Sequence, residues 1–185
     1  MKLLLHICCA PCSIMCIETL RGEGIEPVGF WDNPNIHPFT EFRMRRNTLV
    51  DYAKEIGLSL IVEGGYGLRP FLEAVGGDFD GRCPVCYRLR MRSAARYAAE
   101  NGFTHFTTTL LISPYQNHEL LAQTAREAAE EFGVSFLYRD FRPSFREGQD
   151  RARAMGLYMQ KYCGCIFSEE DRYRKRKKPT KKEEA

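Results

Sequence analysis

Short apolar runs alternate with longer amphipathic stretches along most of the chain. Five apolar runs, several of them rich in β-branched residues, predict strands at residues 3–7, 26–31, 58–62, 103–112 and 134–138. Apolar positions at helical spacing predict helices at residues 13–21, 40–55, 68–75, 85–100, 119–132 and 150–162. The first run is apolar almost without interruption, as is typical of a parallel strand buried on both faces.

Strands that alternate with helices predict an α/β fold. We expect a single domain over residues 1–168, with a mostly parallel sheet of about five strands, helices on both faces and a HUP or Rossmann-like topology. A chain of 185 residues with 44% hydrophobic content is long enough to bury one core of this kind.

The charge of the chain is concentrated at its end. Residues 169–185 contain eight Lys and Arg and five Asp and Glu, and so carry the whole net charge of +3. This composition predicts a basic, disordered tail. A basic tail on a neutral body favours a polyanionic partner, with nucleic acid as the first candidate.

The N-terminal residues lack the long apolar segment and cleavage site of a signal peptide, and no stretch is apolar for long enough to span a bilayer. We therefore expect a cytoplasmic protein without a membrane partner. In a reducing compartment, eight cysteines are more typical of metal ligands or redox catalysts than of structural disulfides.

Polar and reactive residues follow the predicted strands at their carboxyl ends. These residues are Cys8 and Cys9, then 32–37, 113–115 and 140–142. Because the carboxyl ends of parallel strands lie at one edge of a sheet, this edge is the expected ligand site. The remaining cysteine pairs lie in loops that could fold over the same edge.

Cys8 and Cys9 lie in the turn after the first predicted strand, where both thiols can face one point. Two buried, inert cysteines are the alternative interpretation. Cys83 and Cys86 form a Cys-x-x-Cys hook at the start of a predicted helix, which is typical of zinc or iron–sulfur sites, with a thioredoxin-like pair as the alternative. Together the two pairs offer four thiolates, the complement of a 4Fe-4S cluster or a structural zinc.

Cys163 and Cys165 are separated by one glycine and can close a small, strained disulfide, which suits a redox-active pair. Further metal ligands or spectators fit this spacing nearly as well. Cys12 and Cys16 lie four residues apart on one helical face beside the first cysteine pair. Cys12 is close enough to bind a second metal, whereas Cys16 lies one turn deeper and is more consistent with the core.

Other polar residues at this edge carry weaker signals. His37 and His118 are interpreted as solvated or hydrogen-bonded residues rather than as ligands. The loop at residues 33–35, Tyr115 and Arg142 are candidate substrate contacts, for which ordinary turn chemistry is an equal alternative.

Several separate segments resemble the epoxyqueuosine reductase family of the QueH type. They are HICCAPCS, NPNIHP, RCPVCYRLR, GFTHFTTTLLISPYQN, the DFR after the fifth predicted strand, and GLYMQKYCGCIFS. The resemblance covers residues 6–168, and its motifs are long and ordered.

The resemblance implies an oxidoreductase that reduces the epoxide of epoxyqueuosine, at the wobble position of tRNA, to the alkene of queuosine. It implies a 4Fe-4S cluster, whose ligands carry over by motif to Cys8, Cys9, Cys83 and Cys86. It also implies a redox-active disulfide between Cys163 and Cys165 and a possible second, mononuclear iron, for which Cys12 is the candidate ligand. The implied partners are tRNA carrying epoxyqueuosine and an external electron donor, with the basic tail and residues 43–46 holding phosphates.

Two alternatives remain for comparison. A tRNA-thiolating, ATP-pyrophosphatase-like enzyme would share the fold and the RNA partner, but it needs a glycine-rich phosphate turn where this chain has ICCAPCS. A zinc-stapled RNA-binding module without catalysis is the second. A brown protein after anaerobic purification favours the reductase, and a colourless zinc protein favours the module.

Overall fold

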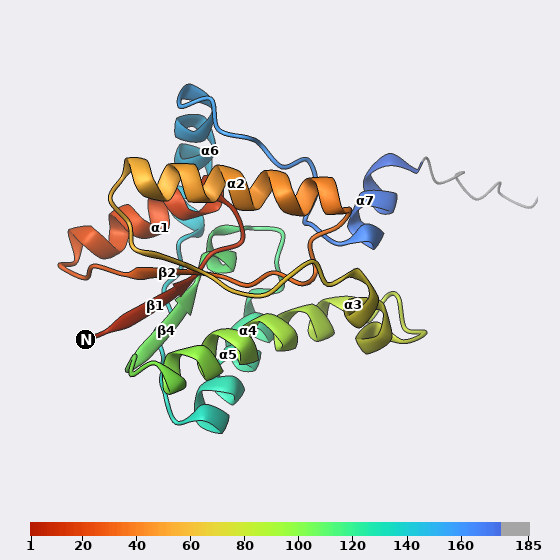
Figure 1. Cartoon of the computed structure of the whole chain (residues 1–185), viewed down its shortest axis with the longest axis horizontal. Coiled ribbons are helices and arrows are strands. Elements are labelled where there is room, and N and C mark those ends of the chain that lie inside the picture. The colour runs from red at the N-terminus through yellow and green to blue at the C-terminus, as the bar shows by residue number, and fades with distance from the viewer. Residues whose placement is uncertain (175–185) are drawn as a thin grey trace, which may run out of the picture.

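The computed structural model describes residues 1–174 (Figure 1). Its strands are β1 (Leu3–His6), β2 (Val28–Trp31), β3 (Leu60–Val62), β4 (His105–Thr108) and β5 (Ser135–Phe136). Its α-helices are α1 (Ala10–Gly22), α2 (Phe39–Glu55), α3 (Leu68–Val75), α4 (Arg82–Glu100), α5 (His118–Phe132), α6 (Phe145–Ala154) and α7 (Ile166–Tyr173). Two 3₁₀ turns are η1 (Thr109–Ile112) and η2 (Arg142–Ser144).

The five strands form one parallel sheet in the order β3-β2-β1-β4-β5. Helices α1, α2 and α6 lie on one side of the sheet, and α4 and α5 lie on the other (Figure 1). This arrangement confirms the predicted α/β fold with helices on both faces.

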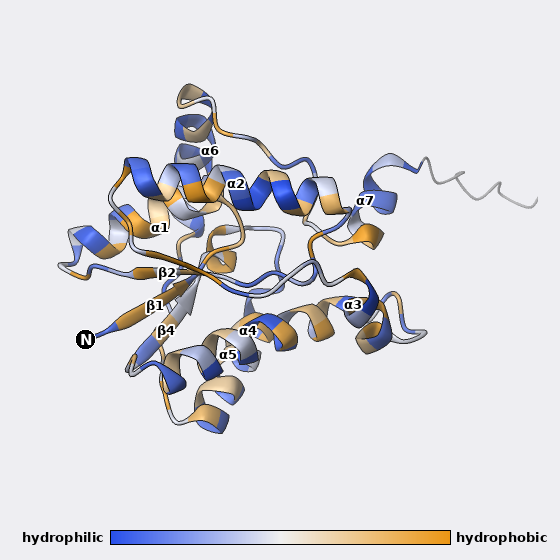
Figure 2. Ribbon diagram, viewed as in Figure 1, coloured by the Kyte–Doolittle hydropathy of each residue, from blue (hydrophilic) through white to orange (hydrophobic). Residues whose placement is uncertain are grey.

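The central strand β1 is buried along its whole length, which explains its three consecutive leucines, and its last residue, His6, is buried as well. Figure 2 shows hydrophobic β1 and β2 between helices that carry both hydrophobic and hydrophilic residues. The main core joins the sheet to the inner faces of α1, α2, α4 and α5. A smaller cluster of Phe71, Val75, Cys86 and Cys165 joins α3, the start of α4 and the segment before α7.

The strand order reverses direction at β1. The chain leaves β1 for β2 on one side and later returns to β4 on the other, so β1 and β4 flank a topological switch point. Ligands of open α/β sheets bind outside the carboxyl ends of strands at such a point. The expected ligand site is therefore at Cys8, which follows β1, and at Thr109, which follows β4.

Two predicted elements are wrong in extent. The strand expected over residues 103–112 ends at Thr108, whose hydroxyl accepts a hydrogen bond from the N–H of Leu110 and starts the 3₁₀ turn η1. The helix expected over residues 150–162 is α6, which lies earlier. It ends before Gly156, whose φ of +67° is the left-handed conformation that commonly closes helices.

Helix α7 is absent from the predicted elements and crosses the domain boundary expected after Ser168. Residues 169–173 are helical and Arg174 caps the helix, and residues 175–185 of the expected basic tail lie outside the described residues. In the part of the chain that the structure describes, no helix combines the length and hydropathy needed to cross a membrane.

A candidate metal and redox site at the carboxyl edge of the sheet

Three buried thiols meet directly beyond β1. The sulfur atoms of Cys8, Cys9 and Cys12 all lie within 4.8 Å of one another, and those of Cys8 and Cys9 are 3.8 Å apart. Cys8 and Cys9 occupy the turn between β1 and α1, and Cys12 lies in the first turn of α1. Within residues 1–174, no other group of three or more His, Cys, Asp or Glu side chains is this compact.

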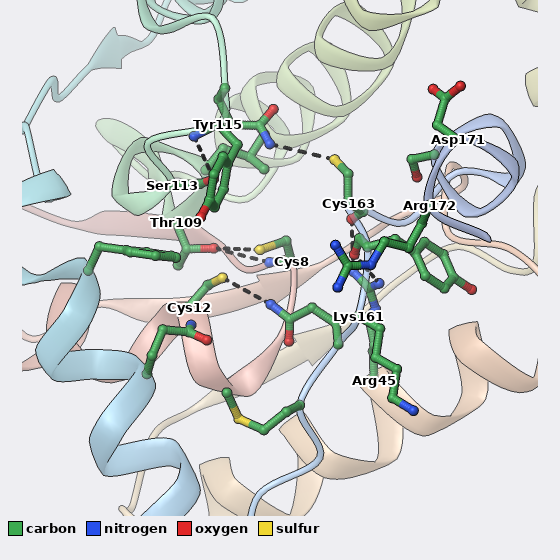
Figure 3. A pocket seen from close by; sticks show the side chains of 18 of the residues that line it. Cys8, Cys12, Arg45, Thr109, Ser113, Tyr115, Lys161, Cys163, Asp171 and Arg172 are labelled. Carbon is green, nitrogen blue, oxygen red and sulfur yellow. Dashed lines mark hydrogen bonds between the residues drawn. The ribbon is translucent and has the colours of Figure 1, made fainter. Parts of the chain in front are cut away.

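The residue after β4 holds Cys8 in place from the neighbouring strand. The backbone N–H of Cys8 donates to Oγ1 of Thr109 at 3.1 Å, and the Thr109 hydroxyl donates to the Cys8 sulfur at 3.4 Å. Figure 3 shows Thr109 beside Cys8, with Cys12 on the adjacent turn. The switch point between β1 and β4 therefore positions the first thiol.

Gln160 contacts the other two thiols. Its Nε2 donates to the sulfur of Cys9 at 3.0 Å and lies 3.4 Å from that of Cys12. Its Oε1 is buried and has no hydrogen-bond partner among the described residues. A buried amide oxygen of this kind is costly unless a ligand or water satisfies it.

The three thiols share their protons unequally. The pKa of Cys8 is well below its ordinary value, because the thiols of Cys12 and Cys9 donate hydrogen bonds to its thiolate and the Arg90 guanidinium lies near it. The pKa of Cys12 is raised, chiefly because it is one of these donors, and burial raises that of Cys9. The group thus favours one thiolate at Cys8, in the form that binds metals.

This donor set fits a thiolate-binding metal. Two thiolates bound to one tetrahedral ion at about 2.3 Å lie about 3.8 Å apart, which matches the Cys8–Cys9 separation. Sulfur donors select metals such as zinc, copper(I) and the iron of iron–sulfur clusters. A polynuclear cluster places its irons between its thiolates and therefore holds them further apart than a single ion does.

Cys83 and Cys86 lie in the first turn of α4, outside the compact group. Cys83 is exposed, whereas Cys86 packs with Cys165, and burial raises the pKa of Cys86 to about 12. A chain of polar contacts links this helix to the Cys8 turn. Arg90 donates to Oδ1 of Asn33 at 2.7 Å, and Nδ2 of Asn33 donates to the carbonyl oxygen of Ile7 at 2.9 Å.

Cys163 and Cys165 are both free thiols in the structure. Cys163 is exposed, and its sulfur accepts a hydrogen bond from Nε2 of Gln116 at 3.5 Å. Between the two cysteines, Gly164 has a φ of +147°, which favours glycine. Its carbonyl oxygen accepts a hydrogen bond from the backbone N–H of His37 at 2.7 Å. The cysteine loop is therefore anchored to the loop before α2.

Arg45 provides a second anchor. Its side chain is 2% exposed and forms an ion pair with Glu41, while its Nη2 and Nη1 donate to the carbonyl oxygens of Tyr162 and Cys163, each at 2.9 Å. The expectation that residues 43–46 hold phosphates is wrong for Arg45, because its guanidinium is buried in these contacts. Arg43 is exposed and keeps that possibility.

A cavity of about 810 Å³ opens beside the thiols. Cys8, Cys12 and Cys163 all line it. Tyr115 stands at its wall with 84% of its surface exposed and meets Phe145 edge to face, with ring centroids 5.9 Å apart. Besides the buried Arg45, the cationic residues that line the cavity are Arg153, Lys161 and Arg172.

The other candidate contacts have structural partners. Asn33 is buried in its contacts with Arg90 and Ile7. Arg142 pairs with Asp140, whose pKa this guanidinium lowers to about 2. His37 is fully buried and hydrogen-bonded, as predicted for a non-ligand.

Sequence reasoning did not single out Thr109, Gln160 or Arg90. Thr109 follows β4 as Cys8 follows β1. This signal is missed when the fourth strand is expected to continue to residue 112. Gln160 and Arg90 lie inside family-like motifs, but the pattern of residues alone shows neither that Gln160 meets thiols nor that Arg90 is buried.

Three comparisons place the chain among known proteins. The family model described as epoxyqueuosine reductase QueH matches residues 3–171. A relative named epoxyqueuosine reductase QueH from Dehalococcoides mccartyi is 37% identical over 96% of this chain and 98% of its own length. A relative of the same name from Thermotoga maritima is 32% identical over 89% of this chain and 88% of its own length.

A solved structure, titled as a predicted subunit of a tRNA methyltransferase from Methanocaldococcus jannaschii, has a TM-score of 0.51. It matches 83% of this chain and 88% of its own at 10% identity. At that identity, the similarity supports the fold alone.

Proposed function

This chain belongs to the epoxyqueuosine reductase QueH family, and from that premise we propose that it reduces the epoxide of epoxyqueuosine in tRNA to the alkene of queuosine. One observation carries the proposal. Thiols from two distant parts of the chain, Cys8 and Cys12 in one and Cys163 in the other, line a single cavity at the switch point of the sheet. This is where the reaction would bring a reducible carbon–oxygen bond close to sulfur-bound metal.

The proposed cofactor is a 4Fe-4S cluster on Cys8, Cys9, Cys83 and Cys86, and its binding would require the sulfur atoms of Cys8 and Cys9 to move further apart than their present 3.8 Å. The contacts from Arg90 through Asn33 to Ile7 support this set, because they tie the helix of the second pair to the turn of the first. The compact spacing of Cys12 with Cys8 and Cys9 supports Cys12 as a ligand of an adjacent iron.

Loss of the epoxide oxygen as water consumes two electrons and two protons. When bound, the iron group supplies electrons one at a time, and a metal ion beside it polarises the carbon–oxygen bond. Closing one disulfide between Cys163 and Cys165 releases two electrons and two protons, which matches one turnover. An external donor must then reduce that disulfide.

The chain's own residues would hold the substrate. The cavity volume falls within the range of about 300–1,000 Å³ typical of small-molecule sites, and so suits one modified nucleoside. A base unstacked from the anticodon loop can lie against the ring of Tyr115. Arg153, Lys161 and Arg172 supply positive charge for the neighbouring phosphates.

Nucleoside analysis tests the reaction. We expect tRNA from cells lacking this protein to contain epoxyqueuosine in place of queuosine, and the anaerobically purified, iron-loaded protein to convert it. With the iron chemically reduced beforehand, a Cys163→Ser variant that keeps the first turnover but loses later ones supports the relay role of the disulfide. A colourless zinc protein without this activity contradicts the proposal.

Serine variants test the ligand set. We expect the Cys83→Ser protein to lose the whole cluster. The Cys12→Ser protein should lose fewer iron atoms per chain than the Cys83→Ser protein does. Cys16→Ser is the matched control, because Cys16 is buried in α1 but donates only to the carbonyl oxygen of Cys12. If the Cys83→Ser and Cys16→Ser proteins bound equal amounts of iron and sulfide per chain, Cys83 of α4 would be excluded as a cluster ligand.

A further inference from the structure

Two arginines are almost completely buried, and their surroundings differ. Arg45 and Arg90 are each 2% exposed. Arg45 has a carboxylate partner in Glu41, at 2.6 Å. Arg90 has no carboxylate within ion-pair distance anywhere in residues 1–174, and its Nε has no hydrogen-bond partner there.

The contacts of Arg90 lie around the proposed metal site. Its Nη1 lies 4.0 Å from the sulfur of Cys86, one helical turn earlier on α4. Its Nη2 donates to Asn33, which in turn holds the carbonyl oxygen of Ile7, the residue before Cys8. The guanidinium thus stands between the two cysteine pairs.

A buried cation without an anion is expensive. Removal of a guanidinium from water costs several kcal/mol, and the side-chain amide of Asn33 returns only part of it. An arginine also stays charged at any pH that the protein meets. Its placement is understandable when the neighbouring thiolates and the group they bind carry the balancing negative charge.

We propose that Arg90 is the counter-charge of the thiolate-bound iron group and raises its reduction potential. The inference rests on the proposed function. A nearby positive charge stabilises the form that has gained an electron more than the form that has not. Arg90 acts through the cysteines and touches no substrate, so it is a positioning and tuning residue rather than a catalytic one.

The midpoint potential of the iron-loaded protein, measured without substrate, tests the inference. We expect Arg90→Met to favour the oxidised form at least tenfold, a shift of about −59 mV for a one-electron couple. Arg90→Lys, which keeps the charge, should restore most of the potential. Arg88→Met is the matched control, because it removes an exposed charge from the same helix and should leave the potential unchanged.

An iron-loaded Arg90→Met protein with the wild-type potential overturns the inference. If the Arg90→Met protein does not fold or does not retain iron, the Arg90→Lys protein tests the inference in its place. Retention of iron near the wild-type potential supports a role for the charge. If the Arg90→Lys protein also loses iron, the shape of the guanidinium matters rather than its charge, and the inference is overturned.

Failure of the proposed function gives different results. If the iron-loaded wild-type protein does not reduce epoxyqueuosine, the proposed reaction is contradicted. The expected effect of Arg90→Met on the midpoint potential is then unaffected. A wild-type protein that binds no iron contradicts both.

Discussion

Nη1 of Arg45 donates a hydrogen bond to the carbonyl oxygen of Cys163 at 2.9 Å, across 118 positions of sequence. The same guanidinium is paired with Glu41 one helical turn earlier on α2. Arg45, held by this ion pair within α2, therefore connects the second crossover helix to the loop that carries the proposed redox cysteines. The geometry of that loop depends on α2 as much as on its own residues.

Arg45→Met should destabilise the metal-free protein by about 3–5 kcal/mol, because it leaves Glu41 buried without its cationic partner, although the hydroxyl of Tyr158 still donates to the carboxylate. Chemical denaturation measures the change. Arg43→Met, an exposed change on the same helix, should cost less than about 0.5 kcal/mol. Equal costs for the two variants would mean that the buried pair contributes nothing specific.

Gln160→Leu should weaken iron binding roughly tenfold or more, because Gln160 is the amide that donates to Cys9 and lies beside Cys12. Competition with an iron chelator measures the affinity. Gln149→Leu is the control, since Gln149 lines the same cavity but makes no hydrogen bond to a cysteine sulfur within the described residues. Unchanged affinity in the Gln160 variant would exclude an outer-sphere role.

Acidification should destabilise the fold through His37. The N–H of Ile166 donates to Nδ1 at 3.3 Å, so the ring proton lies on Nε2, which faces the carbonyl oxygen of Pro34 at 3.0 Å. Burial lowers the pKa of His37 from 6.5 to about 4. The unfolded chain therefore binds more protons than the folded one in this window, and stability falls as the pH falls from 6.5 toward 4.

The size of this effect is about 3 kcal/mol over the whole window. Denaturation of the metal-free protein between pH 7 and pH 4 should show a flatter acid slope for His37→Gln than for the wild type. His105→Gln, at a partly exposed position on β4, should keep the wild-type slope. Identical slopes for His37→Gln and the wild type would contradict the assignment.

Tyr115→Ala should weaken tRNA binding roughly fivefold or more, since stacking of one base contributes about 1–3 kcal/mol. Tyr115→Phe keeps the ring and should bind as the wild type does. Because Tyr115 is 84% exposed, the alanine variant should keep the wild-type unfolding free energy. Tyr138→Ala changes an exposed tyrosine outside the cavity, and a loss of affinity as large as that of Tyr115→Ala would argue against stacking at the cavity wall.

Much of the fold could be predicted because its signals are local. Leu3 to Leu5 are consecutive and apolar, and β1 is indeed the fully buried central strand. The errors arose where local signals were ambiguous. The β-branched and apolar residues up to Ile112 continue the pattern of a strand, although the Thr108 hydroxyl starts a 3₁₀ turn.

The candidate site was less predictable than the fold. That Cys8 and Cys9 face one point follows from their place in a turn, and the fold brings Cys12 to the same point. The assignment of Cys83 and Cys86 to the same metal stays a prediction. The burial of Arg45 could not be predicted from the sequence, because nothing in the local pattern distinguishes Arg45 from its charged neighbours Arg43 and Arg46.

By itself, the sequence determined the order of strands and helices up to α6, the family and the edge of the sheet at which reactive residues gather. These depend on hydrophobic periodicity, on motifs and on the parallel direction of the strands, all of which are written along the chain. Only the tertiary structure decided that Gln160 meets Cys9, that Arg45 holds Cys163 and that Arg90 is buried without a carboxylate. Such contacts join residues many positions apart, and their distances are set by how crossover helices and loops pack rather than by any local pattern.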